Sequence, residues 1–324
     1  MKKSILIAGI GAAVGVVLGA KIYERIGSIK WFETSDFVTL FTKVAGRGET
    51  CIFVHGGPGA WSKSFEKMGG ERLHSFLRMI YVDQRGCGRS EKAWNKDYSL
   101  SRMIADLDEI IAATGEEKVY LMAHSFGGVI ATNYVLQHPE KVKGLILATA
   151  TLNVPEALGV QIEFASKELG IDNLNKIVPD WKNKSRFQTA FRALQRAGKR
   201  YKLLTENIGS FRKLEQVDAS AETVHDFAVR FWNYPEYFDD LLAKTVNISV
   251  PVLAINATRD NSVGDNTAKL KFPNARVYTF RDAGHLMYYE QNREFVRLVH
   301  EFICENLRDE IGSRPAKKLE VIAH

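Results

Sequence analysis

The sequence predicts an α/β fold in which helices flank a mostly parallel central sheet. From residue 37 onward, short apolar runs typical of buried strands alternate with segments of helical periodicity, as expected for strands joined by crossover helices. The apolar side chains at positions 103, 104, 107, 110 and 111 share one helical face, and helices are also expected at 126–137 and 293–307. The expected strands are residues 37–44, 50–54, 79–83, 119–123, 142–148, 251–256 and 276–280.

The alternation stops between residues 151 and 245, and this long stretch predicts a helical insertion. An insertion of this size between two strands of a sheet is typical of a lid that excludes water and lines a substrate pocket. The predicted core is therefore divided into residues 33–150 and 246–310, and the polar residues 311–324 are expected to form a mobile tail. The aromatic residues of the predicted lid are Phe164, Trp181, Phe187, Phe191, Tyr201, Phe211, Phe227, Phe231, Trp232, Tyr234, Tyr237 and Phe238.

Residues 1–23 differ in kind from the rest of the chain. Two lysines precede an uncharged apolar run at residues 5–20, which with two further residues is long enough to span a bilayer as a helix. We expect an uncleaved single-pass anchor that attaches the protein to a membrane. The alternatives are a signal peptide that is cleaved, after which the protein is secreted, and a buried helix. Residues 24–32 are interpreted as a polar connector.

Glycines in the same segment also allow self-association. Gly11, Gly15 and Gly19 recur every fourth residue and would place a smooth stripe on one face of a helix. A second copy of the chain could approach closely along that stripe.

The composition excludes several classes of function. The net charge of +6 is spread along the chain and no nucleic-acid-binding motif is present, so nucleic acid is not an expected partner. Cys51, Cys87 and Cys304 are too few and too scattered for a disulfide framework or a zinc site. The sequence indicates neither a metal nor an organic cofactor.

The segment Ala123-His-Ser-Phe-Gly-Gly128 holds the best candidate for a nucleophile. Ser125 lies between an expected strand and an expected helix. This kind of sharp turn exposes a hydroxyl and needs small residues two positions to either side. Ala123 and Gly127 are such residues. Because a serine hydroxyl is a poor nucleophile unless a base removes its proton, a histidine is required nearby.

His285 is the expected base, and it follows the last expected strand. Asp260 follows the strand at 251–256 and is expected to orient the His285 imidazole, with Asp282 or Asp265 as alternatives. The chain order serine, aspartate, histidine fits a known arrangement of such triads. Because each residue follows the C-terminal end of a strand, we expect them to meet at one edge of the sheet.

Two glycine-rich loops complete the predicted site. Residues 55–59, His-Gly-Gly-Pro-Gly, follow a strand and keep their backbone amides free of bulky side chains. The amides of Gly57 and Phe126 are expected to form an oxyanion hole, which binds the negative oxygen of a transition state. Residues 83–90, Asp-Gln-Arg-Gly-Cys-Gly-Arg-Ser, follow the next strand, and their Asp and Arg side chains are expected to brace neighbouring turns.

Together these segments resemble the α/β-hydrolase superfamily over nearly all of the chain after residue 37. The loops at 55–59 and 83–90, with Ser125 followed by Phe-Gly-Gly, are more narrowly similar to the proline iminopeptidase group of serine hydrolases. The resemblance implies an α/β-hydrolase fold with a helical lid, to which this sequence adds an expected N-terminal membrane helix. It also implies cleavage of an N-terminal residue, often proline, with acidic lid residues that hold the free ammonium group.

The substrate stays open between several hypotheses. The enzyme could be an aminopeptidase that acts on short peptides, or a carboxylesterase or lipase that acts on apolar esters. A catalytically silent protein that binds a ligand under the lid is a third hypothesis, which the intact set of serine, histidine, acid and oxyanion loop disfavours. The substrate-binding residues are expected within 151–245 but carry no motif. The lid glutamates considered for an ammonium group are Glu163, Glu168, Glu206, Glu215, Glu222 and Glu236.

Overall fold

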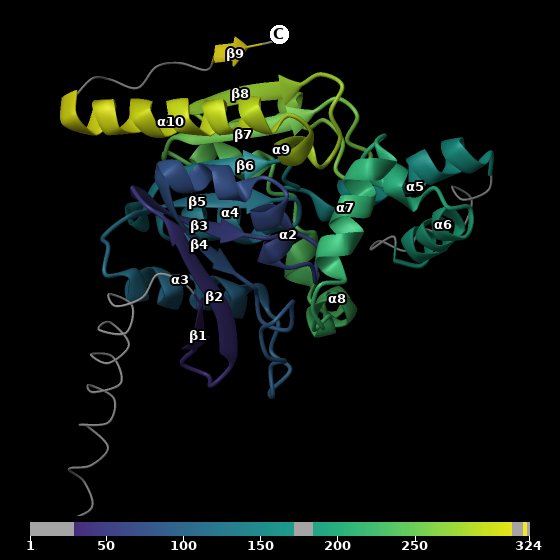
Figure 1. The fold of residues 1–324 in the computed structure, drawn as a ribbon, viewed down its shortest axis with the longest axis horizontal. Coiled ribbons are helices and arrows are strands. Elements are labelled where there is room, and N and C mark those ends of the chain that lie inside the picture. The colour runs from purple at the N-terminus through teal and green to yellow at the C-terminus, as the bar shows by residue number, and fades with distance from the viewer. Residues whose placement is uncertain (1–28, 172–183, 313–319, 323–324) are drawn as a thin grey trace, which may run out of the picture.

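The computed structural model describes residues 29–171, 184–312 and 320–322, and the strands in these ranges form one sheet (Figure 1). Their order across the sheet is β1-β2-β4-β3-β5-β6-β7-β8-β9. β2 pairs antiparallel with β1 and β4, and every other neighbouring pair is parallel, so the predicted mostly parallel sheet is confirmed. The strands are β1 (Ile29–Glu33), β2 (Thr39–Gly46), β3 (Glu49–Val54), β4 (Leu77–Val82), β5 (Val119–His124), β6 (Val142–Ala148), β7 (Val252–Ala257), β8 (Ala275–Phe280) and β9 (Glu320–Ile322).

Helices cover both faces of this sheet (Figure 1). Alternate side chains of β5 show why its sequence is apolar throughout. Leu121 packs into the cluster that contains α3 and α4, whereas Tyr120 and Met122 pack into the cluster that contains α2, α9 and α10. A strand buried on both faces needs apolar residues at every position. The helices are α2 (Ser62–Lys67), α3 (Leu100–Thr114), α4 (Gly127–Gln137), α9 (Met287–Glu290) and α10 (Asn292–Gly312).

The ends of α3 illustrate how local sequence sets these helices. The Ser99 hydroxyl accepts a hydrogen bond from the backbone N–H of Arg102 and so caps the first turn. Gly115 ends the helix at φ +73°, a left-handed conformation that glycine adopts without a steric penalty. Between these caps, the predicted apolar face of the helix is buried against the sheet.

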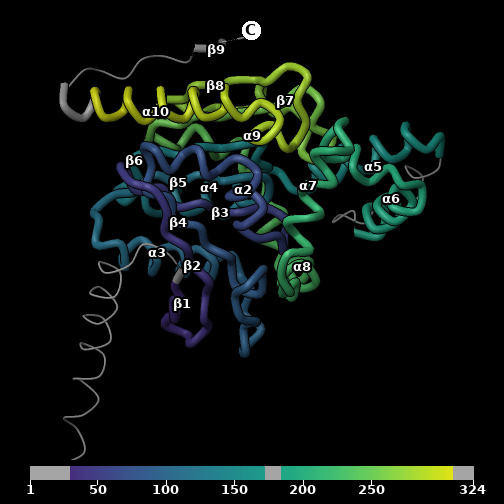
Figure 2. The backbone as a smooth tube through the Cα atoms, in the orientation of Figure 1, coloured from purple at the N-terminus to yellow at the C-terminus, as the bar shows by residue number. Residues whose placement is uncertain are grey.

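The insertion between β6 and β7 is mainly helical. Figure 2 shows α5 and α6 side by side, projecting from the body of the molecule, while α7 packs on α2 of the core. α5 and α6 share a small apolar core of their own, made of Ile162, Ala165, Ala190, Leu194 and Leu203. The helices of this insertion are α5 (Val154–Leu169), α6 (Lys184–Arg196), α7 (Ile208–Asp218) and α8 (Asp226–Arg230), with a 3₁₀ turn at Arg200–Leu203 between α6 and α7.

Two predictions at the ends of the chain are corrected. Residues 29–33 form β1, which pairs with β2, so the connector predicted at 24–32 does not extend through residues 29–32. Residues 320–322 form β9 beside β8, so they are not part of a mobile tail. β1 and β9 are the two outermost strands of the sheet. The local sequence does not identify their partners, because an outer strand pairs with whichever strand would otherwise form the edge.

The predicted membrane segment, residues 1–23 with its three spaced glycines, lies outside the described residues, as does Trp181 of the predicted lid. Within the ranges that the structure describes, no helix has both the length and the hydropathy needed to cross a bilayer. Membrane attachment, signal cleavage and self-association through residues 1–23 therefore stay predictions from the sequence.

Candidate active site

Ser125 lies on a sharp turn between β5 and α4. Its φ of +54° is unusual for a residue with a side chain, and such conformations are found where a functional group must be presented. Close packing around the turn explains its small neighbours. A Cβ atom added to Gly127 would lie 2.2 Å from the backbone oxygen of Val54, and one added to Gly56 would lie 2.6 Å from the Cβ of Ser125. The turn can therefore form only with glycine at both positions.

Asp260 follows β7, His285 follows β8, and the two side chains are hydrogen-bonded to each other. The Nδ1 atom of His285 lies 2.8 Å from Oδ2 of Asp260, and the side chains are only 5% and 1% exposed. The other carboxylate oxygen, Oδ1, accepts hydrogen bonds from the backbone N–H groups of Ser262 (2.7 Å) and Val263 (3.1 Å). These bonds fix the orientation of the carboxylate, so that Oδ2 is held against the His285 imidazole.

The two alternative acids make other contacts. Asp282 is 73% exposed and forms an ion pair with Arg259. Asp265 accepts a hydrogen bond from the backbone N–H of Thr267 at 2.9 Å. Of the three carboxylates considered from the sequence, Asp260 is therefore the one that contacts the His285 imidazole.

Gly57 and Phe126, the two residues predicted to supply oxyanion-hole amides, line the same cavity as Ser125. Gly57 has a φ of +121°, in the region that favours glycine, and the Gly57–Pro58 peptide bond is cis. Phe126 directly precedes α4, so its amide belongs to the unpaired N-terminus of that helix. Among the described residues, no acceptor engages the N–H group of either residue.

A cavity of about 710 Å³ joins these groups, and Ser125, His285, Gly57 and Phe126 all line it. Its outer wall comes from the predicted lid, which contributes the aromatic side chains of Phe187, Phe191, Phe211, Phe231 and Trp232. The sequence therefore located the lid aromatics, but it did not show which of them face the cavity.

Similarity to known proteins agrees with this architecture. The family model described as the alpha/beta hydrolase fold matches residues 50–291. This chain belongs to the α/β-hydrolase family. A proline iminopeptidase of Saccharolobus solfataricus is 25% identical over 297 residues, which cover 87% of this chain and 91% of that protein. The expected class of enzyme, a hydrolase, is thereby confirmed.

Two solved structures share the fold at low identity. A proline iminopeptidase-related protein from Thermus thermophilus has a TM-score of 0.72 at 20% identity and covers 85% of this chain and 96% of that chain. An esterase from Exiguobacterium antarcticum has a TM-score of 0.64 at 19% identity and covers 86% of this chain and 100% of that chain. At these identities the likeness shows the fold alone.

Two carboxylates of this hydrolase face the cavity from α7. Glu215 was among the lid glutamates considered from the sequence, and it pairs with Arg200 at 3.4 Å. Asp218 was not considered, although its spacing of three residues from Glu215 places both on one helical face. Its Oδ1 atom accepts hydrogen bonds from Nε1 of Trp61 and Oγ of Ser64, both at 2.7 Å.

The other lid glutamates do not line the cavity. Glu163 and Glu168 form ion pairs with lysines of the lid. The Glu236 carboxylate accepts a hydrogen bond from the backbone N–H of Leu100 in the core. Glu206 and Glu222 lie in exposed segments of the lid.

His55 braces the loop that carries Gly57, a role that its motif did not reveal. Its Nδ1 atom donates to the carbonyl of Gly56 (2.9 Å), and its Nε2 atom accepts from the backbone N–H of Gln84 (2.9 Å). Burial lowers the pKa of His55, so the neutral ring that this bonding requires is favoured. The Gln84 side chain in turn donates to the His55 carbonyl at 2.7 Å.

The Asp83 carboxylate connects two further loops in the same region. Its carboxylate accepts hydrogen bonds from the backbone N–H and hydroxyl of Ser62 and from the Arg89 guanidinium. Burial raises the pKa of Asp83, but the hydrogen bonds and charge of Arg89 outweigh it, and the pKa is lowered overall. The expected bracing role of this loop therefore has a clear structural basis.

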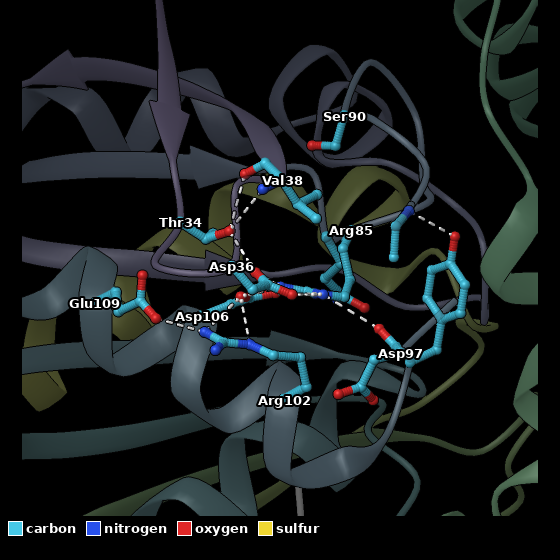
Figure 3. A network of polar contacts seen from close by, with 12 residues as sticks. Thr34, Asp36, Val38, Arg85, Ser90, Asp97, Arg102, Asp106 and Glu109 are labelled. Carbon is cyan, nitrogen blue, oxygen red and sulfur yellow. Dashed lines mark hydrogen bonds and ion pairs between the residues drawn. The ribbon is translucent and has the colours of Figure 1, made fainter. Parts of the chain in front are cut away.

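The Arg85 guanidinium forms a third network of hydrogen bonds, shown in Figure 3. Its side chain is fully buried and donates to Asp106 of α3 (2.6 and 2.7 Å) and to Asp36 of the β1–β2 turn (2.8 and 2.9 Å). It also donates to the backbone oxygen of Asp97 at 3.2 Å. Hydrogen bonds from Arg85 hold the pKa of Asp36 well below its usual range. One guanidinium thus joins the β1–β2 turn to α3 and to the loop that precedes it.

Replacing Arg85 with methionine is expected to lower the free energy of unfolding by about 3–5 kcal/mol, because Asp36 loses its ion-pair partner and the buried Asp106 keeps only Arg102. Urea denaturation monitored by circular dichroism measures the change. Arg47→Met is the matched control, since Arg47 is exposed, and it is expected to stay within about 0.5 kcal/mol of wild type. An Arg85→Met protein as stable as this control would contradict the structural role of the network.

Proposed function

We propose that this α/β hydrolase is a serine hydrolase that cleaves an ester or amide bond through an acyl-enzyme. Ser125 is the nucleophile, His285 the general base and Asp260 the residue that orients it. The observation that carries the proposal is the His285–Asp260 hydrogen bond of 2.8 Å at the base of the cavity that Ser125 lines. The sequence alone had proposed the same three residues.

The proposed reaction has two steps. His285 accepts the hydroxyl proton of Ser125 as the oxygen attacks the substrate carbonyl, and the proton then passes to the leaving alcohol or amine. The amides of Gly57 and Phe126 donate to the oxyanion of each tetrahedral intermediate. Water, deprotonated by His285, then releases the acid and regenerates Ser125. Asp260 stabilises the imidazolium in both steps without becoming protonated.

For the substrate, we propose as the first candidate a peptide-like amide that carries a free N-terminal ammonium group. The proline iminopeptidase of S. solfataricus is a relative along most of both chains, and the carboxylates of Glu215 and Asp218 face the cavity. Two carboxylates are suited to bind the ammonium group of a free N-terminus. The second candidate is an apolar ester, which the aromatic lid wall favours.

Labelling with a fluorophosphonate probe tests the proposed chemistry. We expect wild type to be labelled stoichiometrically, because the probe reacts with an activated serine, and Ser125→Ala to remain unlabelled. An unlabelled wild type would favour a silent binding protein instead. Proline β-naphthylamide and short and long p-nitrophenyl esters then separate the substrate classes by kcat/KM.

Lid variants make this comparison specific. If the substrate carries a free ammonium group, Glu215→Gln and Asp218→Asn are each expected to raise KM for proline β-naphthylamide by about tenfold, because each removes a charge-assisted hydrogen bond. Ester hydrolysis is expected to stay nearly unchanged. Glu163→Gln is the matched control, since Glu163 lies in the lid but not on the cavity. Equal effects on both substrates would argue against ammonium binding.

A further inference from the structure

Two side chains outside the proposed triad converge on the backbone of His285. The Nε2 atom of His124 and the Oγ1 atom of Thr149 each lie 3.2 Å from the His285 carbonyl oxygen. A carbonyl oxygen accepts hydrogen bonds and cannot donate them, so both side chains are donors and His124 carries a proton on Nε2.

His124 donates this bond without a positive charge. Burial, followed by the proximity of His285, holds the pKa of His124 well below its usual range. The centroids of the two imidazole rings are 4.6 Å apart, and the Tyr288 ring packs edge-on against His124 at 5.0 Å. A neutral donor suits this place, because a charge on His124 would oppose the imidazolium that His285 forms during acyl transfer.

Thr149 has a strained backbone conformation. Its φ of +40° lies in a region that β-branched residues rarely adopt, and its side chain is fully buried. Its backbone N–H donates to the carbonyl of Ile255 at 2.7 Å, which helps to hold this conformation. Glycine would relieve the strain but has no hydroxyl to donate. Strained residues of this kind cluster at functional sites.

Both donors are also joined to the nucleophile. His124 directly precedes Ser125 in the chain. The segment around Thr149 bonds to Ser125 on both sides, since the N–H of Ser125 donates to the carbonyl of Ala148 (3.3 Å) and the N–H of Thr151 donates to the carbonyl of Ser125 (3.0 Å). Two short paths therefore connect the backbone of the nucleophile to the backbone of His285.

We propose that His124 and Thr149 are positioning residues that form a clamp on the His285 carbonyl and fix the separation between the Ser125 hydroxyl and the His285 imidazole. The proposal rests on the function proposed above. Asp260 orients the ring at Nδ1, but that bond alone allows the ring and its loop to shift together. The clamp prevents this shift, and a displacement of about 1 Å can lower a rate by roughly 100-fold.

Variants of the full-length protein test the clamp in matched pairs. Thr149→Val and His124→Leu remove a donor at similar volume, whereas Thr149→Ser and His124→Gln keep one. We expect the rate constant for fluorophosphonate labelling and kcat for p-nitrophenyl acetate to fall about tenfold in each donor-free variant, and further when both are combined. The variants that keep a donor are expected to recover most of the rate. KM is expected to change by less than about twofold in the Thr149 variants, because Thr149 does not line the cavity, whereas His124 does.

Several outcomes would overturn the clamp. The clamp is contradicted if Thr149→Val and His124→Leu proteins are labelled as fast as wild type. It is also contradicted if a Thr149→Ser protein is labelled as slowly as Thr149→Val. Should His124→Leu lose its circular dichroism signal, the Thr149 pair decides the question alone. A wild type that the probe does not label would instead contradict the proposed function, so the two failures are distinguishable.

Discussion

Replacing Ser125 with alanine is expected to lower kcat by roughly 10⁴–10⁶-fold, because no acyl-enzyme can form without the hydroxyl. His285→Ala is expected to cause a loss of similar size, since the hydroxyl then keeps its proton during attack. The double variant is expected to be no worse than either single variant, because the two residues act as one unit. Steady-state kinetics on the best substrate of the panel measures all three. KM is expected to change little, since the cavity walls stay intact.

A serine far from the cavity provides the control. The Ser75 hydroxyl is exposed and donates to the carbonyl of Arg72, so Ser75→Ala is expected to leave kcat within about twofold of wild type. If Ser125→Ala retained more than about 1% of the activity, or were still labelled by the fluorophosphonate, the nucleophile would have to be sought elsewhere.

The second large effect is expected from Asp260→Asn, which should lower kcat by about 10⁴-fold while the protein stays folded. The structure explains why an isosteric change is so costly. The N–H groups of Ser262 and Val263 both donate to Oδ1, so an asparagine would place its amide oxygen there and direct its NH₂ group at His285. Nδ1 of His285 would then have to accept, which moves the imidazole proton to the nitrogen that should take the serine proton.

Asp282→Asn is the matched control for this variant. Its carboxylate is exposed and pairs with Arg259, so kcat is expected to stay within about twofold of wild type. An Asp260→Asn enzyme with more than a tenth of wild-type kcat would instead move the orienting role to Asp282 or Asp265. The two alternatives would then be separated by the corresponding Asp265→Asn variant.

Residues whose place in the fold follows from a local pattern could be located from the sequence. Ser125 stands between an apolar run and a helix with small neighbours, and that pattern specifies a sharp turn whatever the rest of the chain does. His285 and Asp260 each follow a strand, so the parallel sheet brings both to one edge. The same reasoning located the loop that carries Gly57.

Residues whose role depends on a distant partner were not predictable. Asp218 faces the cavity because α7 packs on α2, a contact between segments about 150 residues apart in sequence. Asp36 acquires its partner only when the β1–β2 turn meets the buried Arg85. The strained φ of Thr149 has no signature in the amino-acid letters around it.

The sequence by itself determined the α/β class, the order of the strands along the chain, the helical insertion and the residues proposed for catalysis, since these depend on periodicity and on spacing within short segments. Only the tertiary structure decided the order of strands across the sheet, the walls of the cavity, the choice of Asp260 over Asp282 as the hydrogen-bond partner of His285, and the two side-chain hydrogen bonds to the His285 carbonyl. The physical reason is that a hydrogen bond or a packed contact requires two groups to lie within a few ångströms of each other. Local sequence patterns do not specify the distance between groups that are far apart in the chain.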